Sequence, residues 1–165
     1  MRTLLITLGC YALLSSCKKQ PIPNGNIMPP DANLALLDKQ GNSLLTSTST
    51  PIKVWFIHDS QQEYLGQECA GGGCTMVREG HNYQNKPLKY PFYYGSLAMS
   101  LASADGYKIF YLELGGKTDT LFWDVQKTRP NDPLDKYDIV SVKFNGKPVA
   151  IDQDQLPIYP LQRLH

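Results

Sequence analysis

The chain has 165 residues, and its 16 lysine and arginine side chains against 15 aspartate and glutamate side chains give a formal net charge of +1 at pH 7. This length suits one domain with short attachments. A nucleic-acid-binding protein needs a clustered surplus of cations to neutralise phosphates, and the sequence shows no such cluster. Composition and charge therefore indicate a small globular domain and exclude a nucleic-acid partner.

The first 16 residues have the layout of a cleaved export signal. Arg2 is followed by an apolar stretch from Leu4 to Leu14, which is shorter than the about 20 residues of a permanent membrane-spanning helix. The residues Leu14-Ser15-Ser16-Cys17 resemble the lipobox of bacterial lipoproteins. The resemblance implies cleavage before Cys17 and acylation of its thiol. An ordinary secreted protein and an uncleaved anchor are the alternatives.

The resemblance to lipoproteins also predicts where the chain resides. More than one acyl chain on Cys17 gives stable membrane attachment, so we expect lipid to anchor the mature protein. In this class of proteins an aspartate directly after the cysteine favours retention in the inner membrane. Lys18 occupies that position here and predicts the outer membrane of the cell envelope, with the periplasmic or surface face left open.

Residues 17–32 are expected to form a tether between the lipid and a folded domain. The segment contains four prolines, and an extended proline-rich chain rises about 3.1 Å per residue. Such a tether reaches on the order of 45 Å from the membrane. Residues 33–165 are then predicted to form a single domain.

Short β-strands dominate the prediction for this domain. Strands are expected over 33–38, 43–46 and 52–58. The paired glycines 115–116 predict a hairpin between 107–114 and 119–126, and Asn145-Gly146 predicts a second between 137–144 and 147–151. The segment 96–103, SLAMSLAS, is interpreted as a strand because its apolar residues alternate.

Seven or eight short strands separated by turns predict an all-β fold. We expect an antiparallel β-sandwich, immunoglobulin-like or related, with a small β-barrel as the alternative. The chain resembles small β-sandwich lipoproteins of the Bacteroidota type. This resemblance rests on Cys17, on LALLDKQGNSLL at 34–45, and on YLELGGKTDTLFWDV at 111–125 followed by SVKFNGKPV at 141–149. It supports the anchor and the fold and implies no catalytic residue.

Two cysteines remain after the leader and the lipidation site. Cys69 and Cys74 flank a short glycine-rich segment, and an even pair in an oxidising compartment predicts a disulfide. The alternative adds Met76 and His81, which together with both thiolates would form a set of soft metal ligands. We favour the disulfide, because a bridged pair has no thiolate to donate and the spacing matches no metal signature. No cofactor or metal is predicted.

The sequence offers little for catalysis. His58, Asp59 and Ser60 are the residue types of a hydrolase triad, but neighbours on a strand point to opposite faces and do not form a relay. His58 is therefore predicted at the surface, at the end of a strand. We expect a protein that is not an enzyme.

A run of aromatic residues is the strongest candidate for binding. Tyr90, Phe92, Tyr93 and Tyr94 lie together in YPFYY, and tyrosine combines a flat apolar face with a polar tip. One interpretation places them in the core and over a sheet edge. The other makes them an exposed platform for a glycan or a protein.

These observations predict a lipid-anchored envelope protein that acts as a non-catalytic interaction or accessory module. The partner is the membrane itself through Cys17, together with an envelope protein or a glycan. The alternatives are a carbohydrate-binding module that uses the aromatic run, and an envelope metal protein or enzyme.

Overall fold

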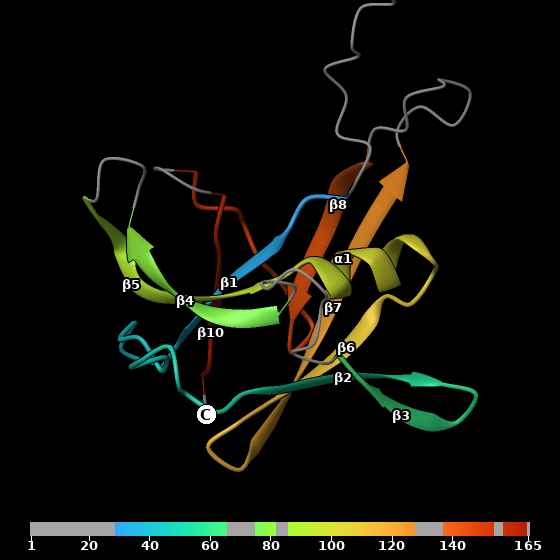
Figure 1. The fold of residues 1–165 in the computed structure, drawn as a ribbon, viewed down its shortest axis with the longest axis horizontal. Coiled ribbons are helices and arrows are strands. Elements are labelled where there is room, and N and C mark those ends of the chain that lie inside the picture. The colour runs from blue at the N-terminus through green and yellow to red at the C-terminus, as the bar shows by residue number, and fades with distance from the viewer. Residues whose placement is uncertain (1–28, 66–74, 82–85, 128–136, 154–156, 165) are drawn as a thin grey trace, which may run out of the picture.

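The computed structural model describes residues 29–65, 75–81, 86–127, 137–153 and 157–164. Within these residues the chain forms two β-sheets and one short helix (Figure 1). The predicted all-β sandwich is confirmed. The alternative of a small barrel is wrong, because the two sheets in the described part of the chain remain separate and each keeps two edge strands.

The smaller sheet has four strands and joins the two ends of the domain. Its order is β10 (Tyr159–Gln162), β1 (Ala32–Leu37), β5 (Pro87–Ser96) and β4 (Thr75–His81). β1 pairs antiparallel with β5 but parallel with β10, so Leu34 lies opposite Tyr159. The predicted tether ends earlier than expected, because Pro29 is already buried and Ala32 belongs to β1.

The larger sheet has six strands, all antiparallel to their neighbours. Its order is β3 (Gln61–Tyr64), β2 (Lys53–His58), β6 (Ile109–Leu114), β7 (Lys117–Lys127), β8 (Tyr137–Phe144) and β9 (Lys147–Pro148). Both predicted hairpins are present, with Gly115, Gly116, Asn145 and Gly146 at positive φ. A third hairpin joins β2 to β3.

Three predicted strands differ from the structure, namely 43–46, 147–151 and 96–103. Residues 43–46 form only a single bridge, between Ser43 and Leu37. The Ser43 hydroxyl donates to the Leu45 carbonyl at 2.8 Å and accepts from the Leu45 amide at 3.2 Å. A side chain therefore satisfies the backbone groups that a neighbouring strand would otherwise bond. The strand predicted over 147–151 ends at Pro148, although the Val149 amide still donates to the Val142 carbonyl at 3.0 Å.

The main hydrophobic core lies between the two sheets. Both sheets contribute fully buried side chains, and the largest of them is Trp123 of β7, whose ring meets that of Tyr159 edge to face at 4.9 Å. A second, smaller core lies on the other side of the four-stranded sheet. Its buried members are Ala35, Leu37, Leu88, Tyr90, Tyr93 and Ile158. All six residues of β1 are consequently buried.

The segment 96–103 is helical, so its interpretation as a strand is wrong. α1 spans Leu97–Ala104, and the Ser96 hydroxyl accepts from the Met99 amide at 3.1 Å as an N-cap. The buried positions are 96, 99, 100 and 103, which is helical spacing carried mainly by serines. Ser103 donates to the Trp123 carbonyl at 2.7 Å and accepts from the Val125 amide at 2.9 Å. These bonds fix the helix to β7 where the ladder to β8 shifts register.

Candidate functional site

The aromatic run in β5 is not an exposed platform. Tyr94 is 1% exposed and lies in the main core, while Tyr90 and Tyr93 are each 7% exposed and lie in the second core. Phe92 is half-buried against the main core. The interpretation of these residues as core is confirmed. Because Tyr90, Tyr93 and Tyr94 are buried, these three rings offer no free face on which a sugar could stack.

A shift in the pairing of β4 with β5 explains why Tyr90 and Tyr93 lie in the same core although they are three residues apart. The register changes between Glu79 and His81, so β5 carries extra residues at this point. A side chain at Gly80 would place its Cβ 1.9 Å from the Tyr90 carbonyl oxygen, so only glycine fits. The bulge turns Tyr90 toward the second core.

The Tyr90 hydroxyl ends in a polar contact with the C-terminal part of the chain. It donates to the Asp152 carboxylate at 2.9 Å, and the Lys89 ammonium donates to the same oxygen at 2.8 Å. Burial, and then the hydrogen bond to Asp152, raise the pKa of Tyr90. The hydrogen bond to Asp152 likewise raises the pKa of Lys89. The group joins Asp152 to β5 and has the contacts of a structural anchor.

The predicted cysteine sites fall outside the described residues, which include neither Cys17, Cys69 nor Cys74. The metal alternative is tested through its other two members. Met76 and His81 lie five positions apart on β4, which is about 16 Å at the rise of a strand, so one ion cannot bind both. Among the described residues, no three histidine, cysteine, aspartate or glutamate side chains converge to hold a metal ion.

His58 lies at the tip of the β2–β3 hairpin, where the sequence placed it at a strand end. Asp59 and Ser60 form the turn with φ of 47° and 65°. The His58 ring contacts two exposed carboxylates, that of Glu63 at 2.9 Å from Nδ1 and that of Asp59 at 3.4 Å from Nε2. The three residues form a solvated charged cluster at the surface, and Ser60 takes no part in a relay.

An exposed aromatic surface does exist, but on the six-stranded sheet. A row of three rings crosses the outer side of this sheet, from Tyr64 on β3 through Trp55 on β2 to Tyr111 on β6. The Trp55 ring stacks on Tyr111 at 5.7 Å with an interplanar angle of 18°, and meets Tyr64 at 5.7 Å and 46°. Trp55 is only 7% exposed, because its two neighbours cover it.

A second row runs beside the rings and is mainly aliphatic. Ile57 is 45% exposed and Ile109 is 51% exposed. Ile109 pairs with Phe122 of β7, and Phe122 pairs with Lys143 of β8, whose ammonium lies 5.4 Å above the phenyl ring. Together the two rows form what we name the outer aromatic face. Its members are Trp55, Ile57, Tyr64, Ile109, Tyr111 and Phe122.

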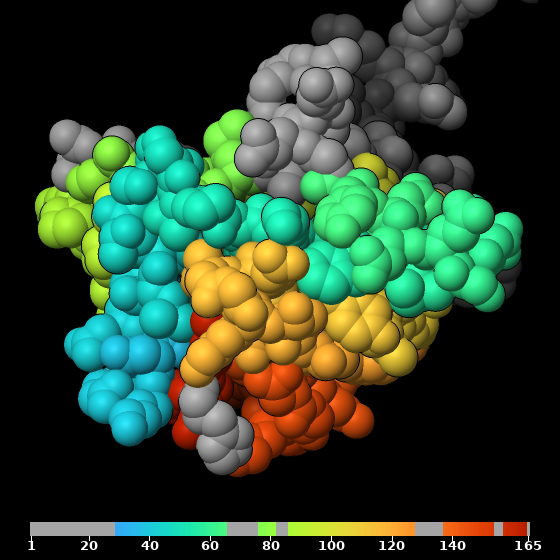
Figure 2. Space-filling model, turned by 90° about the horizontal axis from the view of Figure 1, so that it is seen from below, coloured from blue at the N-terminus to red at the C-terminus, as the bar shows by residue number. Residues whose placement is uncertain are grey.

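The outer aromatic face has a polar border. Its strands follow one another across one side of the molecule, from β2 and β3 in green through β6 and β7 in yellow and orange to β8 in orange-red (Figure 2). At the border the Lys53 ammonium lies 3.1 Å from the Glu113 carboxylate. An apolar centre within a polar rim is the usual layout of a protein interface.

The sequence contained a signal for this face that the aromatic run obscured. In 54–57 and 109–112 every residue is apolar or aromatic, whereas a strand with a solvated face alternates apolar and polar residues. A strand with two apolar faces lies either between two layers or beneath a binding partner. The run of neighbouring aromatic residues on β5 is more conspicuous in the sequence, and it predicted the candidate site there instead.

Comparison with known proteins adds no family to these observations. No protein-family model matches the chain, and no curated protein or solved structure matches it. In the described part of the chain, no helix is long and apolar enough to cross a membrane.

Proposed function

We propose that this protein is a lipid-anchored module of the cell envelope that binds another protein through its outer aromatic face and performs no catalysis itself. The observation that carries the proposal is the pair of apolar rows on the outer side of the six-stranded sheet. Exposed apolar patches of this kind mark interaction sites. Tyrosine, tryptophan and isoleucine side chains that are already ordered by the sheet lose little entropy on binding.

The chemistry of the face favours a protein over a glycan. Sugar binding relies on aromatic rings with free faces, but Trp55 is covered by its neighbours and the most exposed members besides Tyr64 are the aliphatic Ile57 and Ile109. The expected partner presents an apolar patch to this centre. It also presents charges that complement Lys53 and Glu113 at the border.

The anchor in the proposal rests on Cys17 and the proline-rich segment after it. Lipid on Cys17 restricts the domain to a layer near the membrane, which raises the concentration of the module around any partner in the same membrane. The outer membrane is the proposed location, from Lys18. The resemblance to small β-sandwich lipoproteins supports the same assignment.

The binding proposal is tested by photocrosslinking in the native envelope. A benzoylphenylalanine at position 109 should form a discrete adduct with a partner, and the adduct should be lost when Ile57→Ser is added. The matched control places the same group at Val140, which is 55% exposed against 51% for Ile109 and lies on β8, outside the six residues of the outer aromatic face. Equal adducts from positions 109 and 140 would contradict a specific partner. An adduct of twice the chain mass would identify a second copy of this chain.

The anchor is tested separately by membrane fractionation. Cys17→Ala should move the protein from the membrane fraction to the soluble fraction. Cys10→Ala is the matched control, since it removes a cysteine from the same leader but leaves the lipobox intact. Retention of Cys17→Ala in the membrane fraction would overturn the lipoprotein assignment without affecting the binding proposal.

A further inference from the structure

A cavity opens where the edge strands of the two sheets meet. It has a volume of about 440 Å³. Its lining comes from the β8–β9 turn, from Val149 and Ala150 after β9, and from β10. Cavities of this size hold small organic ligands in other proteins. β1 runs from Ala32 to Leu37 toward the end of the sandwich where this cavity opens, and Arg163 links that end to β1 through the Leu37 carbonyl at 2.9 Å. We name the cavity the edge pocket.

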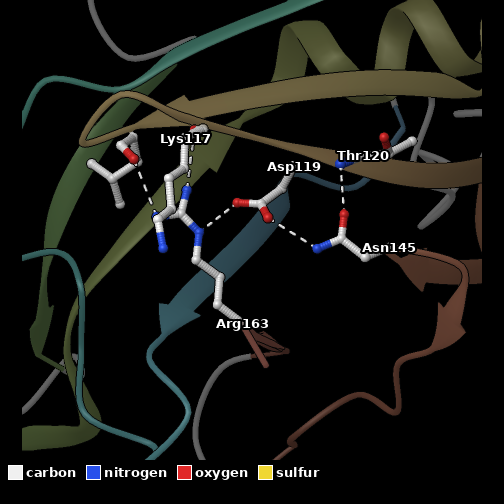
Figure 3. Close-up of polar contacts among 6 residues, drawn as sticks. Lys117, Asp119, Thr120, Asn145 and Arg163 are labelled. Carbon is white, nitrogen blue, oxygen red and sulfur yellow. Dashed lines mark hydrogen bonds and ion pairs between the residues drawn. The ribbon is translucent and has the colours of Figure 1, made fainter. Parts of the chain in front are cut away.

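One wall of the edge pocket is a rigid polar network (Figure 3). The Arg163 side chain donates to the Asp119 carboxylate and, at 3.1 Å and 3.3 Å, to the carbonyls of Leu114 and Lys117. Asn145 donates to the other oxygen of Asp119 at 2.9 Å and accepts from the Thr120 amide at 2.9 Å. Arg163 and Asp119 are only 11% and 10% exposed. These hydrogen bonds hold both side chains in place. The charges of Arg163 and Asp119 offset each other, so this wall is close to neutral.

The remaining lining of the edge pocket is mainly apolar and includes a lysine. The apolar side chains come from both edges of the sandwich and are Phe144, Pro148, Val149, Ala150, Pro160 and Leu164. Lys147 also lines the pocket, is exposed, and has no ion-pair partner among the residues that the structure describes. Since Arg163 and Asp119 balance, Lys147 leaves the lining with one net positive charge.

We propose that the edge pocket binds a small amphipathic anion, namely an apolar body carrying a single carboxylate, sulfonate or phosphate group. The apolar walls bury the body, and Lys147 at the rim pairs with the anionic group. This site is separate from the outer aromatic face and goes beyond the proposed function.

An extended peptide strand is a poorer occupant than a small molecule. Peptides add to a sheet edge through a row of backbone hydrogen bonds. Both strands beside the pocket carry a proline, Pro148 on β9 and Pro160 on β10, and neither nitrogen has a hydrogen to donate. The edges that border the pocket are thereby protected against strand addition.

The proposal is tested with two fluorescent probes on the purified full chain. The anionic probe is 1-anilinonaphthalene-8-sulfonate, and the neutral probe is N-phenyl-1-naphthylamine. We expect one saturable site for the anionic probe, and Lys147→Met should raise its Kd about fivefold, which is the scale of one exposed charge pair. The neutral probe should keep its affinity in this variant. Ala150→Trp should abolish binding of both probes by filling the pocket.

Two matched variants separate the edge pocket from other surfaces. Lys143→Met removes the same charge from the neighbouring strand, and Ile109→Ser alters the outer aromatic face. Neither should change the affinity of the anionic probe. The proposal is overturned when Lys147→Met leaves the Kd of the anionic probe unchanged, when Lys143→Met weakens it as much, or when Ala150→Trp retains binding. Loss of affinity in Ile109→Ser alone would place the probe on the outer aromatic face instead.

Discussion

The outer faces of the two sheets differ although both carry aromatic side chains. On the four-stranded sheet, Tyr90 and Tyr93 are 7% exposed beneath the segment that carries Asp152 and Ile158. On the six-stranded sheet, Ile109 and Tyr64 remain 51% and 55% exposed. An outward-facing ring on a strand is therefore buried or exposed according to whether a distant part of the chain packs over it.

The covering segment is held at two places. Near its start, Asp152 accepts hydrogen bonds from Lys89 and Tyr90. Near its end, Arg163 forms a buried ion pair with Asp119 of β7. Between these anchors β10 adds to β1 in parallel, which brings residues about 125 positions apart into register. The four predictions below follow in order of decreasing effect. The first three weaken this cover, two of them against a matched position on the open sheet, and the fourth changes the open face itself.

The buried ion pair should give the largest effect. Asp119→Ala leaves the Arg163 guanidinium without its carboxylate in a poorly solvated position, so we expect a loss of about 4 kcal/mol in the free energy of unfolding. The control is Glu113→Ala, whose partner Lys53 is solvent-exposed, with an expected loss below about 1 kcal/mol. Urea unfolding followed by tryptophan fluorescence measures both. Equal losses would show that Asp119 does not anchor the covering segment.

A truncation in the second core should come next. Tyr93→Ala creates a cavity under the covering segment and should cost about 3 kcal/mol of stability. Tyr64→Ala removes the same side chain from the open face and should cost less than about 1 kcal/mol. The pair is compared by thermal unfolding. A similar cost at both positions would contradict the distinction between covered and open faces.

The contact of Tyr90 with Asp152 should give a smaller effect that depends on pH. Tyr90→Phe removes one hydrogen bond, worth about 1 kcal/mol at pH 7. Since the folded-state pKa of Tyr90 is raised above 10.0, its stabilisation is complete below pH 10 and is lost as the pH rises through the raised pKa. The wild-type chain should therefore lose more stability than Tyr90→Phe on going above pH 10. Parallel stability curves for the two proteins would contradict this assignment.

The smallest change in stability is expected on the open face itself. Ile109→Ser creates no buried cavity, because the Ile109 side chain is half exposed. We expect the free energy of unfolding to stay within about 0.5 kcal/mol of the wild type. The same substitution should abolish the photocrosslink from a benzoylphenylalanine placed at Ile57. A loss of several kcal/mol would show that Ile109 serves the fold rather than a partner.

Local patterns in the sequence predicted most of the strands. Gly115-Gly116 and Asn145-Gly146 mark their hairpins, because positive φ at both turn positions is a local requirement. The Asp59-Ser60 turn escaped prediction, since serine at φ 65° is unusual and only the pairing of β2 with β3 holds it there. The helix at 97–104 escaped for a related reason. Its buried face is made of serines, and their partners lie more than 20 residues away on β7.

The exposed aromatic platform considered for Tyr90, Phe92, Tyr93 and Tyr94 is not present at those residues. Aromatic rings instead lie side by side on the outer side of the six-stranded sheet. Their position depends on which strands become neighbours. The row Tyr64, Trp55 and Tyr111 joins three strands, two of them separated by more than 40 residues, and no local pattern shows that these rings will touch.

The sequence by itself predicts a leader and lipidation at Cys17, and it determined the strand-rich domain and the two glycine hairpins, because each depends on residues within one short segment. Tertiary structure alone decided which aromatic residues are covered, where the edge pocket lies and how Arg163 reaches Asp119. Strand order and the position of β10 beside β1 are set by packing between segments far apart in the chain. Periodicity along the sequence carries no information about such contacts.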